Sequence, residues 1–190
     1  MTDEELHSWL KELTTGSEQA FEIVYEEIHH HVYRTIYFLV NNKQDANDVA
    51  NEVYIQLIKS IPKYDMNKPF YSWLNGLIVK QTANWNRKLW RKFNLDKKNQ
   101  LFSIEEHPRS TEETMITNEM NSQLLQHVNR LPYKLKVVIV LRYFHDNSFE
   151  EIANTLNIPI GTAKSRHHHA LKNLRNKKLP TESEASLHVH

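Results

Sequence analysis

Apolar residues recur at helical spacing along most of the chain, and no segment alternates apolar and polar residues as a strand does. The first run extends from Ser17 to about Asn41 and carries Phe21, Val24, Tyr25, Ile28, Val32, Ile36 and Leu39. A period of three to four residues places these side chains on one face of a helix. Ser17 is a suitable N-cap, because its hydroxyl can accept a hydrogen bond from the first turn.

The same reasoning predicts six more helices in two groups. The expected ranges are about 45–61, 70–93, 118–130, 132–145, 148–156 and 161–177. Pro62 ends the first of these, and the stretch around Pro108 has no apolar period, which is typical of a linker. We therefore predict an all-α fold of two small helical domains joined by an extended linker. The predicted parts are an N-terminal domain (1–93, three or four helices), an acidic linker (94–117), a C-terminal domain with a helix-turn-helix (118–178, four helices) and a flexible tail (179–190).

Composition excludes several classes of protein. The 190 residues, of which 39% are hydrophobic, are enough for packed cores. The chain has no cysteine, which excludes disulfides and thiolate zinc sites and favours a cytoplasmic protein. The opening "MTDEELHSWL" is acidic and amphipathic, unlike a signal peptide, and no apolar run approaches the ~20 residues of a membrane span.

The net charge of +1 hides an uneven distribution of charge. Six basic residues lie between 86 and 98, six more lie between 164 and 178, and five glutamates lie between 103 and 119. This basic, acidic, basic order predicts two surfaces that bind polyanions.

The predicted helix over 70–93 carries one of these surfaces. Its basic stripe consists of Lys80, Asn84, Arg87, Lys88 and Arg91. Tryptophans are interleaved with the stripe, and basic residues with aromatic residues are typical of surfaces that hold phosphates and unstacked bases. Trp73 and Trp85 also fit a core, whereas the role of Trp90 stays open. On the preceding helix, Asp45, Asp48 and Glu52 form an acidic stripe, which spacing alone leaves open as a solvated face or a docking surface for a basic protein.

The stretch "SFEEIANTLNIPIGTAKSRHHHALKNL" has the pattern of a helix-turn-helix. Ser148 caps its first helix, and the sequence "NIP" breaks that helix before a second, basic one begins. Such a second helix enters the DNA major groove. Its outer face carries Lys164, Ser165, His168, His169 and Lys172. We expect Ala163, Leu171 and Leu174 to face inward and His167 to lie half-buried at the domain edge.

Two histidine triplets, His29–His31 and His167–His169, raise the question of a metal site. Successive helical residues point about 100° apart, so three adjacent histidines cannot converge on one ion. A helical metal pair needs histidines four positions apart, which neither triplet supplies. We predict no metal site here and assign His168 and His169 to contacts with DNA.

Three blocks in this order resemble a known family. They are "DANDVANEVYIQLI" (45–58), "KPFYSWLNGLIVKQTANWNRK" (68–88) and "LPYKLKVVIVLRYFHDNSFEEIANTLNIPIGTAKSR" (131–166). Together they are similar to the extracytoplasmic-function (ECF) sigma factors of bacterial RNA polymerase, in the sigma-70 family. The resemblance spans about residues 17–178.

The resemblance implies a role for each surface. Residues implied to dock on the clamp helices of the large polymerase subunit are Asp45, Asp48 and Glu52. Residues implied to contact the −10 promoter element, with a flipped base held by the first four, are Tyr64, Asp65, Met66, Asn67, Lys80, Asn84, Arg87 and Lys88. Residues implied to read the −35 element are Thr162, Lys164, Ser165, Arg166, His168, His169 and Lys172. The chain departs from the family pattern at Gly76, where arginine is usual, and at Lys80, where asparagine is frequent. It also departs at His167–His169, where aliphatic, aromatic or arginine side chains are usual.

The sequence thus predicts a promoter-specificity subunit without catalytic residues or cofactor. Its expected partners are core RNA polymerase, promoter DNA and an anti-sigma factor. An alternative is a stand-alone helix-turn-helix regulator, which binds duplex DNA without polymerase. A helical metal protein or enzyme built on the 12 histidines fails on the spacing of those histidines.

Overall fold

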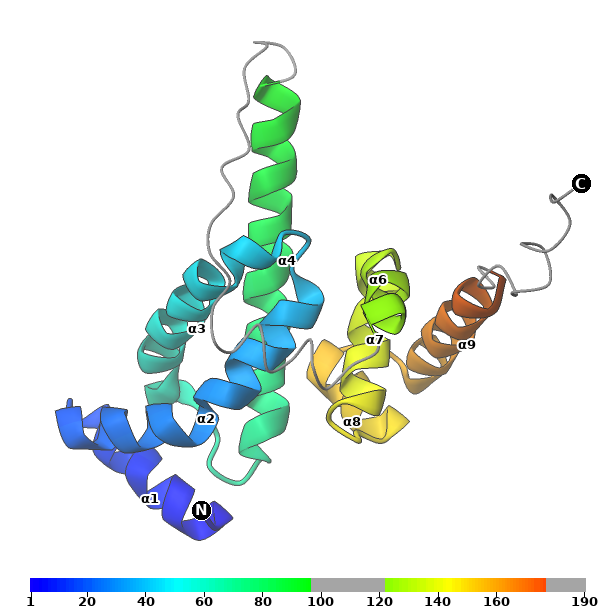
Figure 1. The fold of residues 1–190 in the computed structure, drawn as a ribbon. Helices are drawn as coiled ribbons and strands as arrows, with labels where there is room; N and C mark the ends of the chain where they lie inside the picture. Colours follow the sequence, from blue (N-terminus) through cyan, green and yellow to red (C-terminus); the bar gives the residue numbers. More distant parts are fainter. Residues whose placement is uncertain (97–121, 177–190) are drawn as a thin grey trace, which may run out of the picture.

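The computed structural model describes residues 1–96 and 122–176, and within these ranges every regular element is a helix (Figure 1). The elements are α1 (Asp3–Thr14), α2 (Glu18–Leu39), the 3-10 turn η1 (Lys43–Asp45), α3 (Ala46–Ser60), the 3-10 turn η2 (Ile61–Lys63), α4 (Phe70–Asp96), α6 (Ser122–Asn129), α7 (Tyr133–Tyr143), α8 (Phe149–Leu156) and α9 (Ile160–Asn176). The all-α prediction is therefore confirmed. The predicted tail and all but the first three residues of the predicted linker lie outside the described residues.

The predicted inward faces of the N-terminal helices are buried. Ser17 caps α2 by accepting a hydrogen bond from the backbone N–H of Ala20 at 3.2 Å. In α3, Val49, Val53 and Leu57 are at most 1% exposed and pack against α2 and α4. The apolar period therefore identified the core of this unit.

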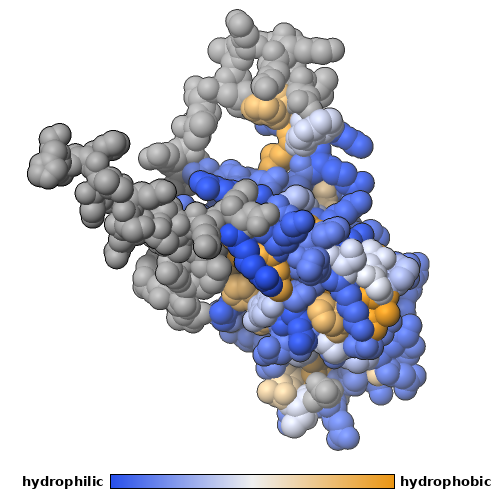
Figure 2. Space-filling model, turned by 90° about the vertical axis from the view of Figure 1, so that its right-hand side faces the viewer, coloured by the Kyte–Doolittle hydropathy of each residue, from blue (hydrophilic) through white to orange (hydrophobic). Residues whose placement is uncertain are grey.

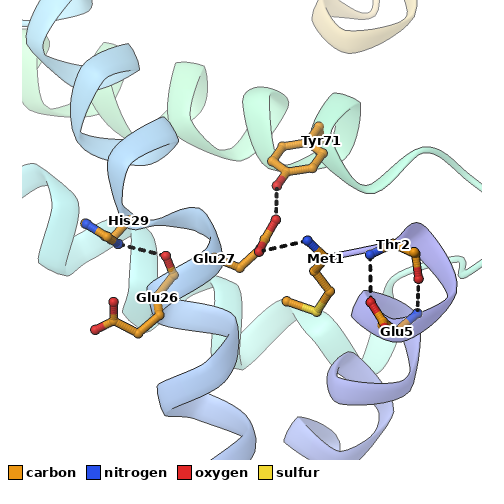
Figure 3. A network of polar contacts seen from close by, with 7 residues as sticks. All are labelled: Met1, Thr2, Glu5, Glu26, Glu27, His29 and Tyr71. Carbon is orange, nitrogen blue, oxygen red and sulfur yellow. Dashed lines mark hydrogen bonds and ion pairs between the residues drawn. The ribbon is translucent and has the colours of Figure 1, made fainter.

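Helix α1 was not predicted as a separate element. Thr2 and Glu5 form a capping box: Thr2 Oγ1 accepts from the N–H of Glu5 at 3.2 Å, and the Glu5 carboxylate accepts from the N–H of Thr2 at 2.9 Å (Figure 3). Leu6, Leu10 and Leu13 bury this helix against its neighbours. The N-terminal unit thus has four α-helices.

The helix-turn-helix has the local geometry that its sequence predicts. Ser148 Oγ accepts from the N–H of Glu151 at 3.1 Å, and the Glu151 carboxylate accepts from the N–H of Ser148 at 2.6 Å. These hydrogen bonds from Ser148 lower the pKa of the Glu151 carboxyl. Asn157 ends α8 with φ +50°, a left-handed conformation that asparagine adopts more readily than most residues. The chain therefore turns sharply before α9 begins at Ile160.

The two helical units pack directly against each other. Helices α2 and α4 of the first unit contact α6, α7 and α8 of the second. Buried residues of both units, such as Ile36 and Leu141, belong to one continuous hydrophobic core. The prediction of two domains joined by a linker did not include this contact.

Candidate nucleic-acid and protein interfaces

The acidic stripe on α3 is only partly a surface feature. Asp48 and Glu52 are exposed and one helical turn apart, so both carboxylates face solvent. Asp45 lies before α3 in η1, is half-buried, and accepts a long hydrogen bond from the Asn42 side chain at 3.4 Å. The structure therefore exposes the pair Asp48 and Glu52 and places Asp45 at the edge of the pair.

Helix α3 also carries two exposed isoleucines. Ile55 is 45% exposed and Ile58 43%, although isoleucine is usually buried. Ile55 follows Glu52 by three residues, so it lies on the same side of the helix. The sequence analysis did not single out either residue. Both interrupt the inward-facing period of α3, which is the signal that could have identified them.

The loop between η2 and α4 presents only part of the predicted set. Tyr64 is 7% exposed, its ring lies 4.7 Å from that of Trp73, and its hydroxyl donates a hydrogen bond to the carbonyl of Lys68. Tyr64 therefore shapes the loop from inside, and its direct contact with a base stays a prediction. Asp65 and Asn67 are exposed, and the Asp65 carboxylate accepts from the backbone and side-chain nitrogens of Asn67 at 3.1 Å each. Met66 is half-buried against the core.

The predicted basic stripe lies along one exposed side of α4. Its members Lys80, Asn84, Arg87, Lys88 and Arg91 are all exposed. Arg87 Nη2 donates to the Asn84 amide oxygen at 2.6 Å, which fixes the direction of the guanidinium.

The tryptophans of α4 differ in their exposure. Trp73 and Trp85 are half-buried against the core, as predicted, and Lys88 Nζ lies 5.2 Å from the Trp85 ring centre. Trp90 is 68% exposed, so it belongs to the surface. The α4 surface thus combines cations with an accessible aromatic ring.

Helix α9, the second helix of the helix-turn-helix, presents the predicted outer face. Lys164, Ser165, His168, His169 and Lys172 are exposed, whereas Thr162 and Arg166 are half-buried. Ala163 is fully buried, and Leu171 and Leu174 pack against a small cluster around Ala170. The side of the molecule that carries α9 is largely hydrophilic, with small separate apolar patches (Figure 2).

The histidines of the two triplets have different surroundings. His167 is half-buried, stacks on Tyr143 at 5.7 Å, and has its pKa lowered by burial and then by Arg142 and His168, so its predicted place at the domain edge is confirmed. In the first triplet, His29 Nδ1 donates to the carbonyl of Glu26 at 2.9 Å (Figure 3), and His30 is exposed. His31 is half-buried against the second helical unit.

The described residues hold neither a cluster of metal ligands nor a membrane-spanning helix. Among residues 1–96 and 122–176, no three histidine, aspartate or glutamate side chains cluster as metal ligands. In the same ranges, no helix is long and apolar enough to cross a membrane.

The predicted −10 and −35 surfaces meet in this structure. Arg87 of α4 and Arg166 of α9 line one mainly apolar groove of about 610 Å³, together with Trp90 and Tyr133. Lys80 faces a second groove whose far wall is α8 and the turn after it, including Asn154 and Asn157. Two surfaces that the sequence assigned to different DNA elements therefore lie side by side.

Comparison with known proteins identifies two matching family models. The model described as "Sigma-70 region 2" matches residues 24–92, which hold the acidic pair and the basic stripe. The model described as "Sigma-70, region 4" matches residues 128–176, which hold the helix-turn-helix. Together the matched ranges cover more than half of the chain.

Relatives match over most of the length of the chain. The ECF RNA polymerase sigma factor SigW of Bacillus subtilis is 28% identical over 173 residues, which cover 87% of this chain and 92% of SigW. The ECF RNA polymerase sigma-E factor of Haemophilus influenzae is 26% identical over 187 residues, or 95% of this chain and 97% of that factor.

Solved structures share the fold. The sigma factor RpoE of Bartonella quintana, crystallised with the anti-sigma factor NepR, matches with a TM-score of 0.65 and 18% identity over 82% of this chain and 94% of that one. CnrH, solved with the cytosolic domain of CnrY, matches with a TM-score of 0.61 and 15% identity over 88% of this chain and 93% of that one.

Proposed function

Since the chain belongs to the sigma-70 family of RNA polymerase sigma factors, with relatives of the ECF type, we propose that it directs core RNA polymerase to specific promoters and helps to open their DNA. One observation carries this proposal. An exposed basic stripe lies in the range matched by region 2, and a capped helix-turn-helix lies in the range matched by region 4.

The region 2 unit supplies contacts with the −10 element. Lys80, Arg87 and Lys88 hold phosphates, and Asn84 lies between them on the same face. Unstacking a base from the duplex costs on the order of a few kcal/mol. The flipped base therefore needs a polar partner that binds it. Asp65 and Asn67 are the exposed polar groups of the loop that can supply it.

The region 4 unit supplies contacts with the −35 element. Helix α9 enters the major groove and presents Lys164, Ser165, His168 and His169 to base edges and phosphates. Lys172 extends this face, while Thr162 and Arg166 lie at its border. A histidine side chain is a shorter and weaker cation than arginine, so we expect promoter readout to differ from that of relatives with arginine here.

Binding to the polymerase rests on Asp48 and Glu52, with the neighbouring Ile55 as the apolar part of the contact. The chain contributes binding energy and DNA contacts, whereas the polymerase carries out the chemistry, so we propose no catalytic residue and no cofactor. A sigma factor acts where polymerase meets the chromosome, so we propose that this chain acts in the cytoplasm. An anti-sigma factor is the proposed inhibitor, in line with the partner of the structurally similar RpoE.

The test is equilibrium binding of fluorescently labelled protein to core RNA polymerase. The substitution Asp48→Lys reverses an exposed charge without disturbing the core, and we expect it to weaken binding at least tenfold. Glu12→Lys makes the same charge change at an exposed position of α1, away from the docking pair, and should leave binding unchanged. Equal binding by both variants would refute the docking assignment.

Open-complex formation on promoter DNA completes the test. A sigma factor melts DNA only with core polymerase present. If the chain instead ignores core and binds duplex DNA tightly alone, it acts as an independent helix-turn-helix regulator.

A further inference from the structure

The contact between the two helical units is specific and polar at several points. Tyr133 of α7 donates its hydroxyl hydrogen to the carbonyl of Val79 in α4 at 2.7 Å. Lys43 Nζ donates to the Asn129 side-chain oxygen of α6 at 3.0 Å. These hydrogen bonds satisfy polar groups that would cost free energy if they were buried without partners. The two surfaces are therefore complementary.

Two histidines meet at the centre of this contact. The rings of His31 in α2 and His145, which follows α7, lie with their centres 4.3 Å apart. The ring of Phe144, the neighbour of His145, lies 4.2 Å from that of Phe38. The histidine pair is therefore embedded in apolar contacts between the two units.

The hydrogen bonds determine which nitrogen of each neutral ring carries the hydrogen. His31 Nε2 lies 2.7 Å from the side-chain oxygen of Asn75, which can only accept, so this nitrogen carries the hydrogen. Thr35 donates its hydroxyl hydrogen to the carbonyl of His31 at 2.6 Å, and its oxygen then accepts from His145 Nε2 at 2.8 Å. Protonation therefore adds a second hydrogen at Nδ1 of a ring that is already bonded through Nε2.

The neighbours of the pair do not favour a positive charge. Burial lowers the pKa of His31 first, and His30 lowers it further, while the Asn75 hydrogen bond raises it. Burial lowers the pKa of His145 to about 3, with added effects of His31 and Arg34. Desolvation and like charges both disfavour the protonated form.

Acidic groups around the pair are engaged with other residues or exposed. Tyr71 of α4 has its ring 4.9 Å from that of His31, and its hydroxyl donates to the Glu27 carboxylate at 3.3 Å (Figure 3). The same carboxylate lies 3.6 Å from the amino group of Met1. Asp146, which follows His145, is exposed.

The packed arrangement is incompatible with reading two promoter elements at once. The −10 and −35 elements are about 25 base pairs apart, or roughly 85 Å at 3.4 Å per base pair. Here Arg87 and Arg166 line a single groove, and Lys80 faces α8. The units must separate before both DNA surfaces can act.

Gly76 allows this packing. A Cβ atom added at Gly76 would lie 3.3 Å from the carbonyl oxygen of Thr155 in α8, so a larger side chain would push α8 away from α4.

We propose that the His31–His145 pair is a latch between the two packed units, and that this latch opens when the pair is protonated. The proposal relies on the proposed function only for the consequence of opening. In the closed state both pKa values are lowered, so acid favours the open state. The latch is fully effective above the ordinary histidine pKa of ~6.5 and weakens as the pH falls below it, by up to about tenfold per pH unit for each histidine.

The test is single-molecule energy transfer between dyes on the free, full-length chain. Because the chain has no cysteine, Asn47→Cys and Asn173→Cys give two unique labelling sites on exposed positions of different units. We expect the ratio of open to closed molecules to rise at least tenfold between pH 7.5 and pH 5.5. The Gly76→Arg variant, whose side chain pushes α8 away from α4, is the reference for the signal of the open state.

Substitutions test whether the pH response comes from the His31–His145 pair. Replacing both His31 and His145 with glutamine should remove the pH response, whereas His30→Gln, at an exposed position beside the latch, should retain it. His145→Arg carries a permanent charge and should open the chain at pH 7.5. A wild-type ratio that is equal at both pH values, or a pH response that persists in the double glutamine variant, overturns the proposal. Because no polymerase is present, either result is independent of the core-binding test with Asp48→Lys.

Discussion

Removing the hydroxyl of Tyr133 isolates one part of the contact between the two units. In this structure that hydroxyl donates to the carbonyl of Val79 at 2.7 Å and lies 2.5 Å from Thr82 Oγ1. Burial raises the pKa of Tyr133, so the hydroxyl stays a protonated donor across the physiological range. Tyr133→Phe keeps the ring and its packing, and leaves no cavity.

The expected loss of closed-state stability depends on the hydrogen bonds that Thr82 and Val79 keep in the variant. Without the Tyr133 oxygen as acceptor, the Thr82 hydroxyl can donate to the carbonyl of Ile78 at 2.9 Å, and the Val79 carbonyl belongs to the hydrogen-bonded ladder of α4. Neither partner is left unsatisfied, so the loss is the net value of two contacts, at about 0.5–1.5 kcal/mol for a full hydrogen bond. We expect about 1–2 kcal/mol, which shifts the closed-to-open ratio about 5- to 30-fold.

The assay is the same energy-transfer measurement at pH 7.5, with Tyr143→Phe as the matched control. Tyr143 is 55% exposed, and its hydroxyl lies 3.0 Å from His167 Nε2 within the second unit. The chemical change is identical, but no contact between units is lost. An open fraction that rises equally in both variants, or in neither, would refute the assigned role of Tyr133.

Two further predictions concern the helix-turn-helix. Ser148→Ala removes the N-cap of α8 and should lower the free energy of unfolding by about 1 kcal/mol, which urea denaturation measures; a change below ~0.3 kcal/mol would contradict the cap. Lys164→Ala removes an exposed cation from the proposed −35 surface. It should weaken promoter binding by the holoenzyme and reduce the slope of log affinity against log salt by about one, whereas an unchanged slope would show that Lys164 contacts no phosphate.

Local patterns were sufficient for most of the helices. Each helix start and end depends on side chains within a few residues, as in the caps at Ser17 and Ser148 and the left-handed Asn157. The inward faces of α3 and α4 followed from a period that near neighbours define. Helix α1 was missed because its three leucines give a short pattern, and their burial depends on α2.

Local sequence patterns likewise predicted only part of the candidate sites. Sequence spacing placed the basic stripe and the outer face of α9 correctly on the surface, because helical periodicity fixes which side chains share a face. It could not tell that Tyr64 is buried or that Asp45 is half-buried, since both lie in short segments without a period. For these residues the packing of other elements decides the exposure.

The sequence by itself determined the helices, their apolar faces, the helix-turn-helix and the resemblance to a family. The tertiary structure alone decided how the two units meet. Thr35 and His145, which share a hydrogen bond, are 110 residues apart, and no local period relates them. Close approach at Gly76 and burial of the His31–His145 pair arise only when α2, α4 and α8 are packed together, because burial and like-charge contact are properties of the assembled interface.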